Sequence, residues 1–134
     1  MRAAEVLLPI LRTALPDVAV ASWISDADHR QLPLVLIRQV GGERSDILPQ
    51  KLVFALVELS VHTRSDLADT EKLYNRAWMA LDTARQQQVV TPAGWIHSLE
   101  GAVSTQSIPV FTDSWRVQGV IRIGLRPTTT NEGV

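Results

Sequence analysis

The sequence has no cysteine, almost no net charge and no long apolar run. Without cysteine there is no disulfide framework, no thiolate metal site and no cysteine nucleophile. A formal net charge of -1 provides no overall basic field that would draw the chain onto nucleic acid or an anionic membrane. No apolar run approaches the roughly 20 residues that span a bilayer. We therefore expect no membrane partner.

Sequence signatures of catalysis and cofactor binding are missing as well. The histidines have no partner at helical or hairpin spacing, which favours surface or edge positions over a metal site: His29, His62 and His97. There is no G-x-S-x-G elbow, no phosphate-binding loop and no dinucleotide fingerprint. We predict no catalytic residue, no metal and no cofactor, and hence no enzyme. A small enzyme or ligand-binding domain with a dispersed site stays open as an alternative.

Length and composition favour one compact domain. A chain of 134 residues with 46% apolar residues is large enough for one hydrophobic core and too small for two. We predict a single domain over residues 1-127 and a disordered C-terminal tail over residues 128-134.

Two segments have the apolar spacing of amphipathic helices. Residues 3-15 carry one apolar stripe, and Pro16 stops the helix. Residues 65-88 carry a second and longer stripe, with Ser65 or Asp66 as the N-cap.

The first strands are predicted between these helices. Residues 18-25 and 33-40 are short β-branched and aliphatic runs separated by a polar stretch, a pattern that favours a hairpin. The paired glycines then open residues 41-50, which we interpret as a mobile loop.

The strongest strand pattern covers residues 51-64, where one face is apolar throughout. The opposite face is apolar at Leu52, Phe54 and Leu56 and turns polar at Glu58. The beginning of this strand is therefore expected to be covered on both sides.

Two further strand regions follow the long helix. Residues 89-114 predict one or two irregular strands broken by Gly101 and Pro109. Residues 115-126 alternate between apolar and polar positions and predict the last strand. The whole order favours an α+β fold, a mainly antiparallel sheet of about five strands with the N-terminal helix and the long helix packed on one face.

Four charged residues in the predicted strands are candidates for function. Arg116, Arg122 and Arg126 share the polar face of the last strand and could contact passing phosphates, acidic residues of a neighbouring subunit or solvent. Glu58 is the one carboxylate inside an apolar strand. It is expected where the strand becomes exposed, or paired with an arginine across the sheet or across a subunit boundary; a raised pKa suited to acid-base work is the other interpretation.

Three segments together resemble the tail terminator and tail-completion family of long-tailed bacteriophages, whose members are minor tail proteins. They are PLVLIRQVGGERSD, VFALVELSVHTRSDLADTEKLYNRAWMAL and SWRVQGVIRIGLRP. In that family an N-terminal helix precedes a strand ending in glycines, a long apolar strand leads into an amphipathic helix, and a final strand closes the sheet. The resemblance covers most of residues 1-127.

The resemblance implies a structural role in the virion. A ring of identical subunits, expected to be a hexamer, would cap the tail tube at its head-proximal end, stop tube polymerisation and offer a surface to the head-tail connector or stopper protein. Genome DNA would pass through the ring, and the protein would be made in the host cytoplasm. The tube-docking loop would comprise Gly41, Gly42, Glu43, Arg44, Ser45 and Asp46, and the channel or interface arginines Arg116, Arg122 and Arg126. A head-tail stopper or another neck protein is the alternative within the same class.

Overall fold

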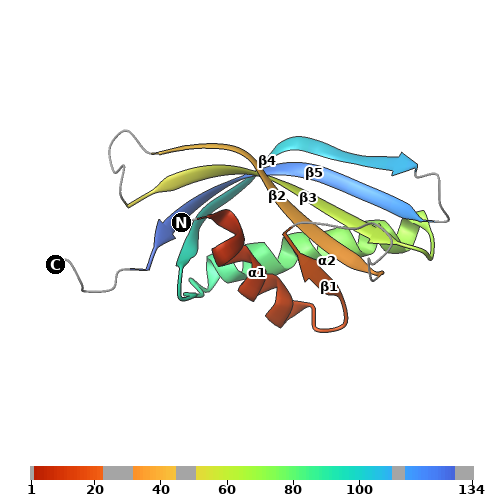
Figure 1. Cartoon of the computed structure of the whole chain (residues 1–134), viewed down its shortest axis with the longest axis horizontal. Helices are drawn as coiled ribbons and strands as arrows, with labels where there is room; N and C mark the ends of the chain where they lie inside the picture. The colour runs from red at the N-terminus through yellow and green to blue at the C-terminus, as the bar shows by residue number, and fades with distance from the viewer. Residues whose placement is uncertain (1, 23–31, 45–50, 110–113, 129–134) are drawn as a thin grey trace.

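The fold was analysed in a computed structural model that describes residues 2–22, 32–44, 51–109 and 114–128 (Figure 1). These residues form two helices and five strands, which confirms the α+β prediction. In chain order the elements are α1 (Ala3–Ala14), β1 (Ala19–Ala21), β2 (Leu34–Arg44), β3 (Val53–Thr63), α2 (Leu67–Gln86), β4 (Gly94–Pro109) and β5 (Trp115–Pro127).

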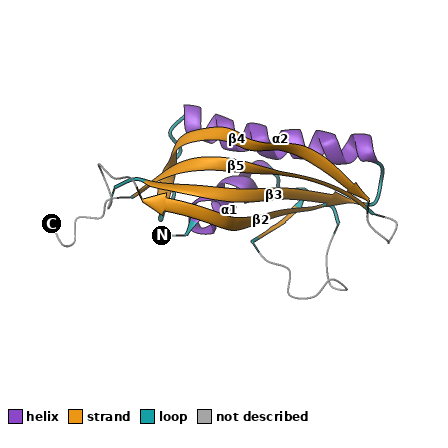
Figure 2. Cartoon of the chain, turned by 90° about the horizontal axis from the view of Figure 1, so that it is seen from above, coloured by secondary structure: helices purple, strands orange, loops and turns teal. Residues whose placement is uncertain are grey.

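The strands form one curled mixed sheet with the order β1-β2-β3-β5-β4. The pairs β2–β3, β3–β5 and β4–β5 are antiparallel, and only β1–β2 is parallel. Figure 2 shows the four long strands running side by side, with β4 and β2 outermost among them. A mainly antiparallel sheet was the sequence prediction.

Helix α2 begins and ends at recognisable capping residues. The Asp66 side chain accepts a hydrogen bond from the Asp69 N–H at 2.7 Å, as expected for an N-cap. At the other end Gln88 has a positive φ of 51°, and the Val89 N–H donates to the Ala84 carbonyl at 3.0 Å. These contacts satisfy backbone groups that the helix itself leaves unpaired.

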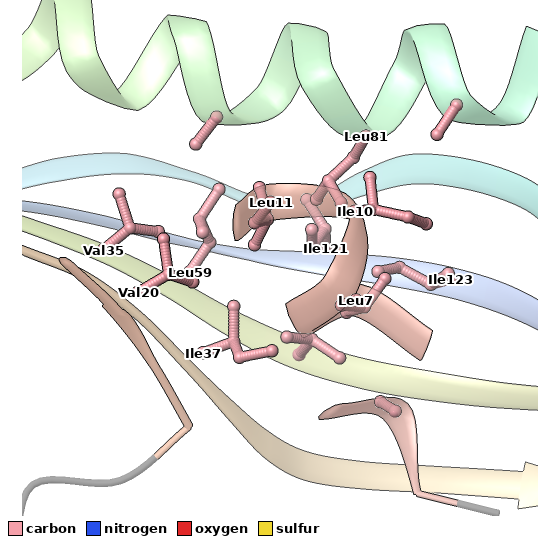
Figure 3. Close-up of a cluster of buried hydrophobic side chains, with 14 of the residues drawn as sticks. Leu7, Ile10, Leu11, Val20, Val35, Ile37, Leu59, Leu81, Ile121 and Ile123 are labelled. Atoms are coloured by element: carbon pink, nitrogen blue, oxygen red, sulfur yellow. The ribbon is translucent and has the colours of Figure 1, made fainter. Parts of the chain in front are cut away.

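One hydrophobic core joins both helices to the sheet. Leu7 and Leu11 of α1, Leu81 of α2, Leu59 of β3 and Ile121 of β5 are all at most 2% exposed (Figure 3). Burial of each such side chain contributes about 1.5–3 kcal/mol relative to exposure. The strand residues come from alternate positions, so one face of the sheet supplies the core.

The predicted hairpin between residues 18-25 and 33-40 is wrong. β1 pairs with β2 in parallel, with Ala19 opposite Leu34 and Ala21 opposite Leu36. Alternating residues identify a strand but do not encode the direction of its partner. Residues 23–25 of the predicted strand lie outside the described residues.

The predicted loop at 41-50 is wrong for its first four residues. Gly41–Arg44 continue β2 and pair with Leu56, Ala55, Phe54 and Val53 of β3. A Cβ atom on Gly42 would lie 2.7 Å from the Phe54 carbonyl oxygen, so the backbones approach here more closely than a side chain permits. Residues 45–50, including the candidate residues Ser45 and Asp46, lie outside the described residues.

Burial along β3 also differs from the prediction. Phe54 and Leu56 are only half-buried, whereas Ser60 and His62 on the same face are 1% and 5% exposed. The two polar side chains lie 3.4 Å apart, His62 Nε2 to Ser60 Oγ. The end of the strand covered on both sides is thus the second one, and His62 is a buried residue rather than a surface one. Polarity of a side chain does not reveal this cover, because a hydrogen-bonded polar group can be buried.

In the described part of the region 89-114 there is one strand, which is one of the two alternatives that the sequence left open. β4 runs through Gly101 and ends at Pro109, and its register with β5 shifts between Ile96 and Ser98 and at two places between Gly101 and Gln106. The glycine therefore lies inside an irregular strand and does not end it. Beyond β5, the Thr128 N–H donates to the Ala93 carbonyl at 3.1 Å.

Candidate functional site

The candidate arginines lie on the sheet face opposite the core. Arg116, Arg122 and Arg126 of β5 are half-buried, and they alternate with buried residues such as Val117 and Ile121. The two-residue period of the strand therefore placed them correctly on a common face. We refer to Arg116, Arg122 and Arg126 together as the arginine row.

Arg116 takes part in an ion-pair ladder across three strands. Glu58 of β3 is bound by Arg38 of β2, Nη2 to Oε2 at 3.1 Å, and by Arg116 of β5, Nη2 to Oε1 at 3.5 Å. The Glu58 side chain is 14% exposed, against 61% for Arg38 and 31% for Arg116. The carboxylate is the most buried of the three charged groups, and the two arginines on either side of it compensate its charge.

Two buried polar atoms of β5, one of them in Arg116, have no partner in the described part of the chain. Within the described residues, Arg116 Nε and the Gln118 side-chain oxygen have no hydrogen-bond partner. One is a donor and the other an acceptor, and both lie on the sheet face that carries the arginine row.

The other two members of the row are held by aromatic rings and oxygen acceptors. Arg122 Nη1 lies 3.2 Å from Glu100 Oε1 of β4, and its guanidinium lies 4.3 Å from the centre of the Phe54 ring. Arg126 donates from Nε to the Lys51 carbonyl at 3.3 Å and lies 5.7 Å from the centre of the Trp95 ring. Cation–π contacts of this kind orient each guanidinium through its face, while its N–H groups bind the oxygen acceptor.

Glu58 and Arg38 show what sequence analysis reached and what it missed. Pairing of Glu58 with an arginine across the sheet was one of the sequence interpretations, and the structure confirms it. Arg38 was missed, because its contact depends on the β2–β3 register that places it directly opposite Glu58. Only the register of β2 against β3 identifies this partner, and the sequence pattern does not give that register.

A second charged pair joins α2 to the segment after α1. Arg76 binds both carboxylate oxygens of Asp17, at 3.0 and 3.2 Å. The hydrogen bonds from Arg76 lower the pKa of Asp17, and the same bonds raise the pKa of Arg76. The pair borders a pocket of about 490 Å³ that Thr63 and Lys72 also line.

Metal ligands and membrane-spanning helices are not found in the described part of the chain. No three of its histidine, aspartate and glutamate side chains are grouped to hold a metal ion. Of the helices described, neither is long and apolar enough to cross a membrane. His97 lies at the surface, edge-on to Trp95 with 6.2 Å between the ring centres, and His29 lies outside the described residues.

Comparison with known proteins identifies the family. Residues 1–132 match the family described as phage tail termination protein. The gene 22 protein of Mycobacterium phage L5 is 39% identical over 133 residues, which are 96% of each chain. The gene 22 protein of Mycobacterium phage D29 is 37% identical over 128 residues, 93% of this chain and 92% of that one.

Among solved structures, a chain of a native gene transfer agent virion covers 94% of this chain and 88% of its own. Its sequence identity is 18% and its TM-score is 0.38. The family match and the two relatives span nearly the whole sequence. This chain belongs to the phage tail termination protein family and is a structural protein of a bacteriophage tail.

Proposed function

We propose that the protein forms a ring of identical subunits on the head-proximal end of the tail tube. The ring ends tube polymerisation and provides the surface to which the head connector attaches. The observation that carries this proposal is the match of residues 1–132 to the tail termination family.

The two unlike borders of the sheet support ring formation. The terminal strands in the strand order are β1, which has three residues, and β4, which has sixteen. A contact between two different borders of identical subunits is heterologous, and repetition of such a contact closes into a ring when the rotation fits. A contact between two identical borders would stop at a dimer.

Tube docking is assigned to the end of the β2–β3 pair. Gly41, Gly42, Glu43 and Arg44 form the last paired residues of β2, and Ser45 and Asp46 follow them. Because the paired stretch is hydrogen-bonded to β3, it is a rigid base for the residues that follow it in the sequence. Deletion of residues 45–48 removes none of the paired residues of β2 and is expected to give a folded ring that fails to complete tails. Normal head joining in this variant would contradict the assignment.

The arginine row is assigned to the channel side of the ring, where genome DNA would pass. Arg116 and Arg122 are already paired with Glu58 and Glu100, whereas Arg126 has no carboxylate partner among the described residues. We therefore expect weak, salt-dependent DNA binding by the assembled ring. Replacement of the three arginines by glutamine should flatten that salt dependence. Unchanged binding would place the arginine row away from DNA.

Tail length is the test of the proposed function. A phage from which the gene is deleted should produce tails that exceed their normal length and carry no heads, and complementation in trans should restore both. Tails of normal length that lack heads would favour a head-tail stopper instead. In that case the purified protein would bind the connector and not the tube.

A further inference from the structure

Two arginines on the outer face of the sheet, the face opposite the core, lie directly opposite a carboxylate in the neighbouring strand. Arg38 of β2 pairs with Glu58 of β3, and Arg122 of β5 pairs with Glu100 of β4. The closest nitrogen–oxygen distances are 3.1 Å in the first pair and 3.2 Å in the second. Strand register therefore places each carboxylate where it neutralises an arginine of this face.

Arg116 reaches Glu58 along the strands rather than across them. It lies opposite His62, four positions along β3 from Glu58, which corresponds to about 13 Å of strand. Arg116 Nη2 is nevertheless 3.5 Å from Glu58 Oε1, so the two side chains extend toward each other along the sheet. Among the described carboxylates only Glu58 binds Arg116, and it therefore holds this guanidinium against the sheet.

Arg126 has no carboxylate partner among the described residues. Its Nε donates to the Lys51 carbonyl, and its guanidinium lies near the Trp95 ring. Four arginines and two glutamates give this face a small positive charge rather than a strongly basic character. The two glutamates determine that balance, because Glu58 binds two arginines and Glu100 binds a third.

Ion pairs within a face affect how strongly the face binds DNA. Each phosphate that an arginine neutralises adds about 0.9 to the magnitude of the slope of log affinity against log salt, and the contacts made by all copies in a ring add together. A carboxylate bound to the same guanidinium competes with phosphate for its N–H groups. Such ion pairs therefore lower the affinity for DNA without removing all of the positive charge.

We propose that Glu58 and Glu100 hold the arginines of the outer face back from the genome, so that the ring guides DNA without retaining it. This inference rests on the proposed ring and on the channel side assigned to the arginine row. Both glutamates are positioning residues, because they act on DNA through Arg38, Arg116 and Arg122 rather than by contact. Loss of the two carboxylates lets phosphate take their place on three guanidinium groups.

DNA binding by the capped tube tests this inference. Tail tubes capped with the ring are titrated with a short linear DNA duplex over a series of salt concentrations. The variants are Glu58→Gln and Glu100→Gln, the second of which changes a side chain that is 63% exposed. The matched control is Asp82→Asn, which removes the same charge from a 2.9 Å pair with Arg85 on α2. All samples contain the same tubes, so differences in affinity come from the ring.

Each glutamate variant should raise the affinity for DNA about tenfold at low salt and steepen the salt dependence, whereas Asp82→Asn should change neither. Glu100→Gln should have a smaller effect in a chain that also carries Arg122→Gln. An equal rise with Asp82→Asn would overturn the inference, because overall charge and not this face would then determine binding. An undiminished effect in the Arg122→Gln chain would overturn it as well, because the carboxylate would not act through the arginine.

Electron microscopy of the same samples separates this inference from the proposed function. Capped tubes whose affinity for DNA responds to neither glutamate variant overturn the inference alone. Absence of rings from the tube ends overturns the proposed function and the inference with it.

Discussion

Tyr74 of α2 holds its hydroxyl directly over Gly119 of β5, where a Cβ atom would lie 2.5 Å from the tyrosine oxygen. Tyr74 is 6% exposed, and the absence of a side chain at Gly119 makes room for its ring. The contact between Tyr74 and Gly119 thus fixes the position of α2 on the sheet.

Gly119→Ala should lower the free energy of unfolding by about 1–3 kcal/mol, because the added methyl group overpacks the contact with a buried ring. Tyr74→Phe in the same chain should recover part of the loss, since it removes the clashing oxygen. Urea unfolding of the four members of this double-mutant cycle measures the coupling.

Gly101→Ala is the control for that cycle. A Cβ atom at Gly101 has no neighbour within 4 Å, so the free energy of unfolding should change by no more than about 0.5 kcal/mol. Equal destabilisation at both glycines would show that strand glycines, and not the tyrosine contact, determine the effect.

The pKa of Tyr74 should be above its ordinary value of 10.0, because burial disfavours the charged phenolate. The folded state then holds the proton more tightly than the unfolded state. The contribution of protonated Tyr74 to the free energy of unfolding is therefore fully present below pH 10 and is lost as pH rises through the pKa of Tyr74 in the folded state. Tyr74 is the only tyrosine, so ultraviolet absorbance of phenolate reports on it alone. A midpoint no higher in the folded protein than in urea would contradict burial of the hydroxyl.

Gln88→Gly should raise the free energy of unfolding by about 0.5–1 kcal/mol. Gln88 is a residue other than glycine in the left-handed region, at φ 51° after α2, where glycine has no Cβ penalty. Gln87 provides the matched control with φ -87°, and Gln87→Gly should destabilise, because it only adds flexibility to the unfolded chain. Thermal unfolding of the two variants should shift in opposite directions.

Glu58→Gln should destabilise by about 1–3 kcal/mol, because it leaves the partly buried Arg116 without its counter-charge. Glu100→Gln removes a carboxylate that is 63% exposed and should cost at most about 0.5 kcal/mol. Denaturant unfolding of both variants tests the comparison. Equal effects would mean that the position of Glu58 between two strands adds nothing.

The elements with a strong period were predicted closely. The apolar stripe and Asp66 located α2 within two residues at each end, and the alternation at 115-126 gave β5 together with the face of its arginines. In these segments local sequence and tertiary burial require the same pattern. Family resemblance, which the sequence already carried, was confirmed over residues 1–132.

Pairing between strands was not predictable from these patterns. The parallel β1–β2 pair and the extension of β2 through Gly41–Arg44 depend on which strand lies alongside. Paired glycines usually mark a turn, but here Gly42 allows close approach to the Phe54 carbonyl. The Arg38–Glu58 contact and the burial of His62 likewise depend on register and on cover supplied from elsewhere in the chain.

The most direct test of the account is the position of the protein on tail tubes. Purified protein carrying a gold label is mixed with preformed tubes of the tail tube protein and imaged by electron microscopy. The account predicts one ring on one end of each tube, and no further growth from that end when free tube protein is added. Label distributed along the tube walls, or continued growth from the labelled end, would contradict it.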